Sequence, residues 1–175
     1  MIYHPCKLAG VFEIRLDVKP DERGFFARTW CRDEFEEHGL DPRMVQCSLS
    51  FSTVKGTLRG MHYQTAPYAE TKLVRCTRGA VYDVVVDLRR GSPTFKDWFA
   101  VILSADARNM VYVPQGCAHG FLTLERGSEV FYQMSEFYNT ESARGVRWDD
   151  PAFAITWPEK VEVISERDQN YPNFE

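Results

Sequence analysis

Short runs of alternating apolar and polar residues dominate the hydrophobic pattern of this chain. Residues 11–18 (VFEIRLDV) alternate one by one, which indicates a strand with one buried face. The pattern returns over residues 45–53, 57–64, 71–77, 80–88, 98–103, 110–113, 118–124 and 129–137. Many short strands separated by Gly, Pro, Ser and Asn turns predict a sandwich or barrel rather than α/β units.

Helical signals are sparse by comparison. Residues 32–39 (RDEFEEHG) predict a short helix, because acidic residues come early and a glycine ends the run. A last strand is predicted at residues 153–157, and the composition of the polar tail from Pro158 marks it as dispensable. A length of 175 residues predicts one domain over residues 1–175, large enough to bury a core.

Composition narrows the classes of protein that remain. Hydrophobic residues make up 44% and charged residues 26%, which predicts a soluble globular protein, and an aromatic share of 14% suits a β-rich fold. The net charge of −4 argues against nucleic acid as the main partner, although a small anionic ligand needs only a few local cations.

The cysteines and the N-terminus predict a cytoplasmic location. The five cysteines are odd in number and include no CxxC pair, so neither a zinc ribbon nor a disulfide framework is expected. The first residues lack the features of a signal peptide, and no apolar run approaches the roughly 20 residues of a membrane helix.

The stretch Gly56–Gln64 (GTLRGMHYQ) is unusual for a strand, since it carries Arg59 and His62 among glycines. Glycine inside a strand often marks a bulge or a close approach, and histidine can serve as a general base. The structural alternative is a core histidine bonded to a neighbouring strand. Because Arg59 and His62 are three residues apart, both can reach one cavity only if the strand bulges, and Gly60 is the natural place.

Four more polar residues fall within predicted strands. Lys72 lies on the apolar face of its predicted strand, where a lysine needs a functional role or a charged partner. The alternative is that its side chain reaches solvent at the start of the strand. We expect Asp83 to pair with Lys72 or His62, either at a site or as a structural salt bridge. His119 lies beside a glycine at a strand start. Tyr132 faces inward, where its hydroxyl needs a partner or acts as a proton donor.

Other chemistries find little support in the spacing of residues. The four histidines form no HxH, HxxxH or HExxH pattern, so a metal on two histidines and a carboxylate stays only an alternative. GxSxG, GxGxxG and P-loop patterns are absent, which argues against a serine nucleophile, a bound dinucleotide and a kinase reaction.

From Gly10 to its C-terminus, the chain resembles the dTDP-4-dehydrorhamnose 3,5-epimerase family. The matching motifs are DERGFF (21–26), GTLRGMHYQ (56–64), KLVR (72–75), DLR (87–89), SPTF (92–95), PQGCAHGF (114–121), WDDP (148–151) and ISERD (164–168). The resemblance implies an all-β, cupin-like jelly-roll barrel with a few short helices, usually a homodimer, working without a metal or redox cofactor. It also implies epimerisation of a nucleotide-linked 4-keto-6-deoxyhexose at carbons 3 and/or 5 through an enolate.

The resemblance assigns roles to particular residues. It implies that His62 is the base, that Asp168 pairs with His62, and that Tyr132 is the acid on the opposite face. Lys72 would stabilise the enolate oxygen. Further substrate-binding residues implied by the family are Arg23, which would reach across the dimer, and Arg28, Gln46, Ser48, Arg59, His119 and Arg167. Asp168 reverses the expectation that the tail is dispensable.

Several positions depart from the family pattern. Cys47 and Ser48 replace a common Asp-Asn pair, and Arg28 stands where family members commonly carry an acid. Ala143 replaces a family glutamate, unless Glu141 takes its place. The alternatives are therefore a single-centre epimerase or keto-isomerase on a related nucleotide sugar, a non-catalytic barrel that binds a nucleotide sugar, and a metal-dependent cupin enzyme.

Overall fold

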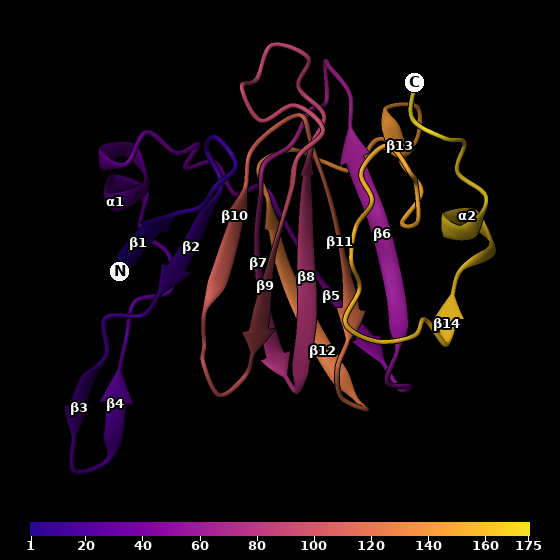
Figure 1. Ribbon diagram of the computed structural model, residues 1–175. Coiled ribbons are helices and arrows are strands. Elements are labelled where there is room, and N and C mark those ends of the chain that lie inside the picture. Colours follow the sequence, from indigo (N-terminus) through magenta and orange to yellow (C-terminus); the bar gives the residue numbers. More distant parts are fainter.

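Two β-sheets face each other in the computed structural model, which describes residues 1–175 (Figure 1). One sheet has the order β1 (Ile2–Pro5), β2 (Phe12–Arg15), β10 (Met110–Val113), β7 (Lys72–Arg78), β12 (Ser128–Met134), β5 (Gln46–Ser52). The other has the order β13 (Ala143–Gly145), β6 (Thr57–Gln64), β11 (Cys117–Thr123), β8 (Ala80–Asp87), β9 (Trp98–Ser104), and β14 (Val163–Ile164) pairs in parallel with β6. The predicted all-β jelly-roll architecture is confirmed.

Three smaller elements complete the chain. The hairpin of β3 (Lys19–Asp21) and β4 (Gly24–Phe26) projects away from both sheets (Figure 1). Helix α1 (Arg32–Glu37) lies beside β1 and β2, and helix α2 (Glu166–Gln169) follows β14 in the C-terminal strap, which we define as residues 158–175. Neither helix has the length and apolar composition needed to cross a membrane. All five cysteines are free thiols, as predicted.

The main core fills the space between the sheets. It is built from alternate strand residues, among them Val74, Val85, Phe121 and Val130, all at most 2% exposed. This arrangement follows from strand geometry, since successive side chains point to opposite faces.

Both sheets are also covered on part of their outer faces. Phe35 of α1 is fully buried against Ile14 and Met110 on the outer side of the first sheet. Val84 and Val86 on the outer side of the second sheet lie under Phe153 and other residues of the C-terminal part. Burial on both faces explains why β8 is apolar on both faces apart from Asp83 and Asp87, rather than strictly alternating.

Most predicted elements are confirmed within a residue or two, but the C-terminal part differs. The strand predicted at residues 153–157 is wrong. Phe153 lies in a turn instead, and its side chain packs against Val84 and Val86 on the outer face of the second sheet. The strap carries β14 and α2, so its apparent dispensability is also wrong. The sequence reading also missed β1 and β13, which are only four and three residues long.

Candidate active site

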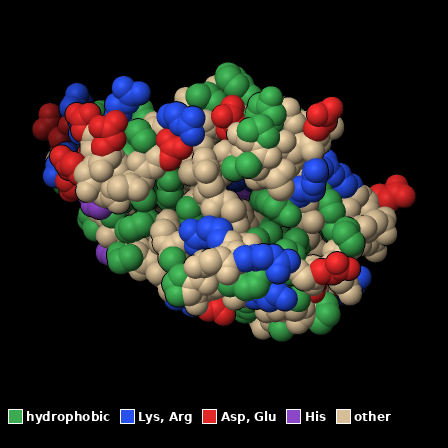
Figure 2. All heavy atoms as spheres, turned by 90° about the horizontal axis from the view of Figure 1, so that it is seen from above, with side chains coloured by type: hydrophobic (Ala, Val, Ile, Leu, Met, Phe, Trp, Pro, Cys, Tyr) green, Lys and Arg blue, Asp and Glu red, His purple; other side chains and the backbone are tan.

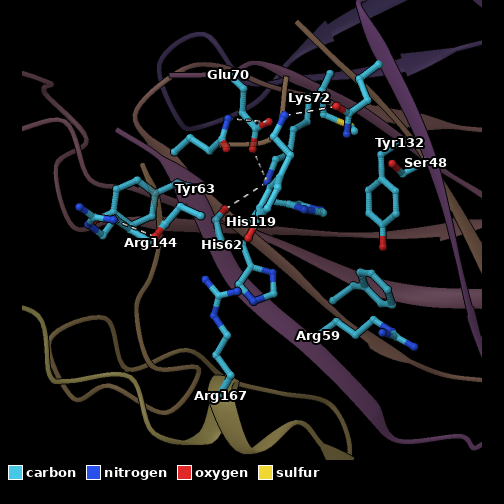
Figure 3. Close-up of a pocket in the computed structure, with 16 residues that line it drawn as sticks. Ser48, Arg59, His62, Tyr63, Glu70, Lys72, His119, Tyr132, Arg144 and Arg167 are labelled. Carbon is cyan, nitrogen blue, oxygen red and sulfur yellow. Dashed lines mark hydrogen bonds and ion pairs between the residues drawn. The ribbon is translucent and has the colours of Figure 1, made fainter. Parts of the chain in front are cut away.

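A cavity of about 420 Å³ opens between the two sheets, lined by side chains of β5, β6, β7, β11 and β12 (Figure 3). Seen from above, the molecule is hollowed near its centre, and lysine and arginine side chains gather around the hollow (Figure 2). The predicted site residues that line this cavity are Gln46, Ser48, Arg59, His62, Lys72, His119, Tyr132 and Arg167. Asp168 lies directly behind His62.

Two predicted substrate contacts lie elsewhere in this chain. Arg23 stands at the tip of the β3–β4 hairpin, its side chain 83% exposed and paired with Asp21. Arg28 forms an ion pair with Glu34 at 3.2 Å. Neither lines the cavity of its own chain.

The predicted bulge in β6 is present at Gly60. His62 pairs with His119 of β11 and Arg59 pairs with Phe121, so β6 carries one residue more than β11 between these points. The φ of Gly60 is 136°, and a Cβ atom added there would lie 2.5 Å from Cα of Gly120. The bulge therefore needs glycine, and it turns Arg59 and His62 toward one cavity.

His62 is oriented by an acid from the C-terminal strap. Oδ1 of Asp168 lies 2.6 Å from Nε2 of His62, and Oδ2 accepts a hydrogen bond from the Gly60 amide at 3.2 Å. Ser165 caps α2 by accepting from the Asp168 amide, which fixes the acid in place. Burial raises the pKa of Asp168, but the bonds from His62 and Gly60 outweigh it and hold the pKa below its usual value. An ionised Asp168 keeps the proton on Nε2 and leaves Nδ1 free to accept one.

A second His–Asp pair lies deeper between the sheets. Nε2 of His119 is 2.8 Å from Oδ2 of Asp83, and the two side chains are 4% and 0% exposed. The expectation that Asp83 pairs with Lys72 or His62 is therefore wrong, because the register of β8 and β11 sets Asp83 opposite Phe121 and so makes His119, two residues along the same face, its diagonal neighbour. Burial raises the pKa of Asp83, although His119 opposes this rise.

Lys72 is mostly covered and has partners inside the protein, so the alternative that it reaches out to solvent is wrong. Its side chain is 13% exposed, and Nζ lies 3.2 Å from Glu70 and donates to the carbonyl of His62 at 3.3 Å. Glu70 had no sequence signal of its own. Its place beside Lys72 depends on the turn between β6 and β7.

Tyr132 presents its hydroxyl to the cavity from β12. Its Oη lies 2.6 Å from Oγ of Ser50, and its ring packs against Phe121. Burial is the main cause that raises the pKa of Tyr132 to about 12, so the phenol is protonated at neutral pH. A buried, protonated phenol is a suitable proton donor.

Cations surround the rest of the cavity. Arg59 is held by Oγ of Ser52 at 3.2 Å and by the carbonyl of Phe51 at 3.1 Å. Arg167 and Arg144 also line the wall, and sequence reasoning missed Arg144 together with the aromatic residues Tyr63 and Tyr138 (Figure 3). This charge suits an anionic ligand such as a phosphate ester.

The departures from the family pattern fall partly within this wall. Ser48 and Ala143 line the cavity, whereas Glu141 does not, so Glu141 does not replace the missing glutamate at this wall. No group of three or more His, Cys, Asp or Glu side chains is placed to hold a metal ion.

A second cavity of about 520 Å³ adjoins the first. Both are lined by Arg59, His62, Tyr132 and Arg167. The second extends toward β14 and α2, where Asp168 lines it, and it also includes Ser50 of β5. The base candidate and the acid candidate therefore border two cavities each.

Comparison with known proteins points to one family. The family model described as dTDP-4-dehydrorhamnose 3,5-epimerase matches residues 5–175. A protein of that name from Sinorhizobium fredii is 41% identical over 175 residues, which cover 99% of this chain and 90% of the relative. A crystal structure of such an epimerase from Elizabethkingia anophelis has a TM-score of 0.97 at 39% identity, covering 99% of this chain and 96% of that one. A 3'-monoepimerase from Streptomyces bikiniensis, solved with dTDP-quinovose, has a TM-score of 0.89 at 34% identity, with 97% and 86% covered.

Proposed function

Because the chain belongs to the dTDP-4-dehydrorhamnose 3,5-epimerase family and is an epimerase of a nucleotide-linked keto-deoxysugar, we propose that it inverts both carbons beside the ketone of a dTDP-linked 4-keto-6-deoxyhexose. The same residues that the sequence singled out would carry the reaction.

In this proposal, Nδ1 of His62 removes the proton from a carbon next to the ketone. Asp168 holds the opposite ring nitrogen and stabilises the imidazolium that forms. The negative charge moves to the ketone oxygen, which Lys72 and His119, both in the cavity wall, would stabilise by charge and hydrogen bonding. A single well-placed donor of this kind contributes about 3–4 kcal/mol to the stabilisation of an oxyanion.

Tyr132 then returns a proton to the opposite face of the same carbon, which inverts the centre. The base and the acid must be different groups, because each face of the sugar needs its own. Arg59 and Arg167 would bind the diphosphate, and Gln46 and Ser48 would contact the nucleoside end.

The observation that carries this function is the presence of an oriented base and a separate, buried acid in one cavity. His62 is fixed by Asp168 at 2.6 Å, while Tyr132 keeps its proton because its pKa is raised to about 12. A barrel that only binds nucleotide sugars needs neither feature, which argues against the non-catalytic alternative.

The test is NMR of dTDP-4-keto-6-deoxyglucose with the protein in deuterated water. Deuterium at both carbons flanking the ketone, with doubly inverted product after reduction, would establish a 3,5-epimerase. Deuterium and inversion at one carbon would instead establish a single-centre enzyme like the 3'-monoepimerase. Absence of exchange would overturn the proposal for this substrate.

We also propose a homodimer that completes the site. Phe25 and Phe26 on the projecting hairpin are 45% and 72% exposed, and Leu49 and Phe51 on the outer side of edge strand β5 are 56% and 46% exposed. Apolar patches and free strand edges are typical of protein interfaces. A partner hairpin lying along β5 would bring Arg23 close to the cavity. Light scattering should give a mass near twice 20.3 kDa, and a monomer would contradict the proposal.

A further inference from the structure

After one inversion by acid–base epimerisation, neither catalytic group has the protonation state that the next inversion needs. After one inversion His62 carries the proton it removed, and Tyr132 is a phenolate that has lost one. Neither group can act again until a proton moves from the imidazolium to the phenolate. An enzyme that inverts two carbons of one bound sugar must complete this reset while the substrate fills the first cavity. The inference that follows rests on the proposed function.

The second cavity offers a route beside the first, and the two share Arg59 and Arg167 in their walls. It is bordered by both groups that must be reset, His62 and Tyr132, and it also reaches their partners Asp168 and Ser50. Its volume of about 520 Å³ and the hydroxyl, carboxylate and imidazole groups in its wall suit a group of water molecules.

Ser50 is placed to pass a proton to Tyr132 from this side. Its Oγ lies 2.6 Å from Oη of Tyr132, and it lines the second cavity but not the first. Ser48, two residues away on the same face of β5, lines the first cavity instead. A substrate in the first cavity therefore contacts Ser48 and leaves Ser50 in place.

We propose that water in the second cavity returns the proton from His62 to Tyr132, and that Ser50 is the relay residue at the tyrosine end. The imidazolium gives its Nδ1 proton to a water molecule, and a proton passes along the water to Oγ of Ser50, so the proton on Nε2 stays beside Asp168. Ser50 gives its own hydroxyl proton to the phenolate oxygen. One N–H bond breaks and one O–H bond forms at Tyr132, so the net charge of the site is unchanged.

Burial supplies the driving force for this return. A phenolate is costly in a buried position, and burial is the main reason that the pKa of Tyr132 is raised to about 12. Asp168 remains ionised beside His62, so the base regains its neutral form with the proton on Nε2.

The first test separates the two inversions in a single turnover. Excess enzyme is mixed with dTDP-4-keto-6-deoxyglucose, the reaction is stopped with borohydride, and singly and doubly inverted products are counted by NMR. Ser50→Ala should complete the first inversion, which uses protons already in place, and slow the second at least about tenfold, so singly inverted sugar accumulates. Ser50→Thr keeps the hydroxyl and should restore the ratio of the two products.

A residue that merely orients Tyr132 would slow both inversions equally. Equal slowing of the two steps by Ser50→Ala, or no change in either, overturns the relay. Affinity for dTDP, measured by calorimetry, should be the same in the wild type and both variants, which shows that the binding site is intact.

A second variant tests the cavity without touching the hydrogen-bonded groups. Val163 of β14 lines the second cavity and is 43% exposed, so tryptophan there would fill space that water needs. Val163→Trp should accumulate singly inverted sugar as Ser50→Ala does, whereas Val163→Ala should behave like the wild type. A normal product ratio in a folded Val163→Trp variant would refute the route.

The wild type separates failure of the inference from failure of the function. If the wild type exchanges no deuterium, the proposed function fails first. If the wild type inverts only one carbon, the proton must return from His62 to Tyr132 between one turnover and the next. Ser50→Ala should then give a burst of one product per enzyme, followed by slow turnover. Absence of that burst, with an active wild type, overturns the relay alone.

Discussion

Replacing Asp168 with asparagine tests the orientation of the base directly. The carboxylate accepts from two donors, Nε2 of His62 at 2.6 Å and the Gly60 amide at 3.2 Å. Asparagine has one acceptor and one donor group, and the Gly60 amide can only donate. The amide oxygen should therefore turn to Gly60, and the NH₂ group should donate to His62. This arrangement places the imidazole proton on Nδ1, the nitrogen that must accept.

The wrong tautomer together with the loss of the negative charge should cost roughly three orders of magnitude in kcat, or about 4 kcal/mol in the activation barrier. Loss of one charged hydrogen bond should lower the free energy of unfolding by about 1–3 kcal/mol. Because the folded-state pKa of Asp168 is depressed, its stabilisation is present above its unfolded pKa of about 3.9 and is lost as the pH falls through the folded value. The stability difference between wild type and variant should therefore shrink in acid.

The assay is deuterium exchange at the carbons beside the ketone, with thermal unfolding as the check on folding. Asp149→Asn is the matched control, because Asp149 forms an ion pair with Arg147 at 2.8 Å near the surface, where such pairs contribute about 0–1 kcal/mol. The control should keep wild-type exchange. An Asp168→Asn variant that is folded and loses less than about tenfold in kcat would refute the orientation argument.

Three further changes probe other parts of the structure. Tyr132→Phe should lower product formation by about 10²–10⁴-fold while deuterium still enters at a carbon next to the ketone; loss of dTDP binding instead would contradict its role as the acid. Gly120→Ala places a Cβ atom 2.6 Å from Sδ of Met61, so we expect the free energy of unfolding to fall by about 1–3 kcal/mol and Tm to fall with it. An unchanged Tm would show that the backbone around the bulge shifts to make room for the methyl group. Asp87 is fully buried, and bonds from Arg89 and nearby hydroxyls hold its pKa low against the effect of burial. Asp87→Asn should therefore cost about 3 kcal/mol in urea unfolding at pH 7 and less below pH 4, because there the unfolded chain binds a proton at this carboxyl that the folded chain does not; an equal loss at both pH values would refute this.

The alternation of apolar and polar residues, together with the strand face on which each residue lies, predicted much of the fold and the bulge at the site. The alternation over residues 57–64 gave the bounds of β6, and the three-residue spacing of Arg59 and His62 predicted a bulge at Gly60 that the register with β11 confirms. These features depend on neighbours along the chain, whose geometry a sequence states directly. The family resemblance added the base His62, the acid Tyr132 and Asp168, the distant partner of the base in the strap.

Contacts between distant segments could not be obtained in this way. Asp83 shares its strand face with apolar residues whatever its partner is, so only the register of β8 and β11 assigns it to His119. Ser50 and Tyr132 are 82 residues apart, and nothing in the local sequence of either pairs their hydroxyls.

The sequence by itself determined the β-rich class, the strands and the residue types available for acid–base chemistry, because these follow from periodicity and side-chain chemistry. Tertiary structure alone decided that His62 and Asp168, 106 residues apart, meet at 2.6 Å, and that His62 and Tyr132 border two cavities. Strand order, register and the path of the C-terminal strap determine these contacts. They are fixed by how the two sheets and the strap pack, which is a property of the whole chain rather than of any short stretch.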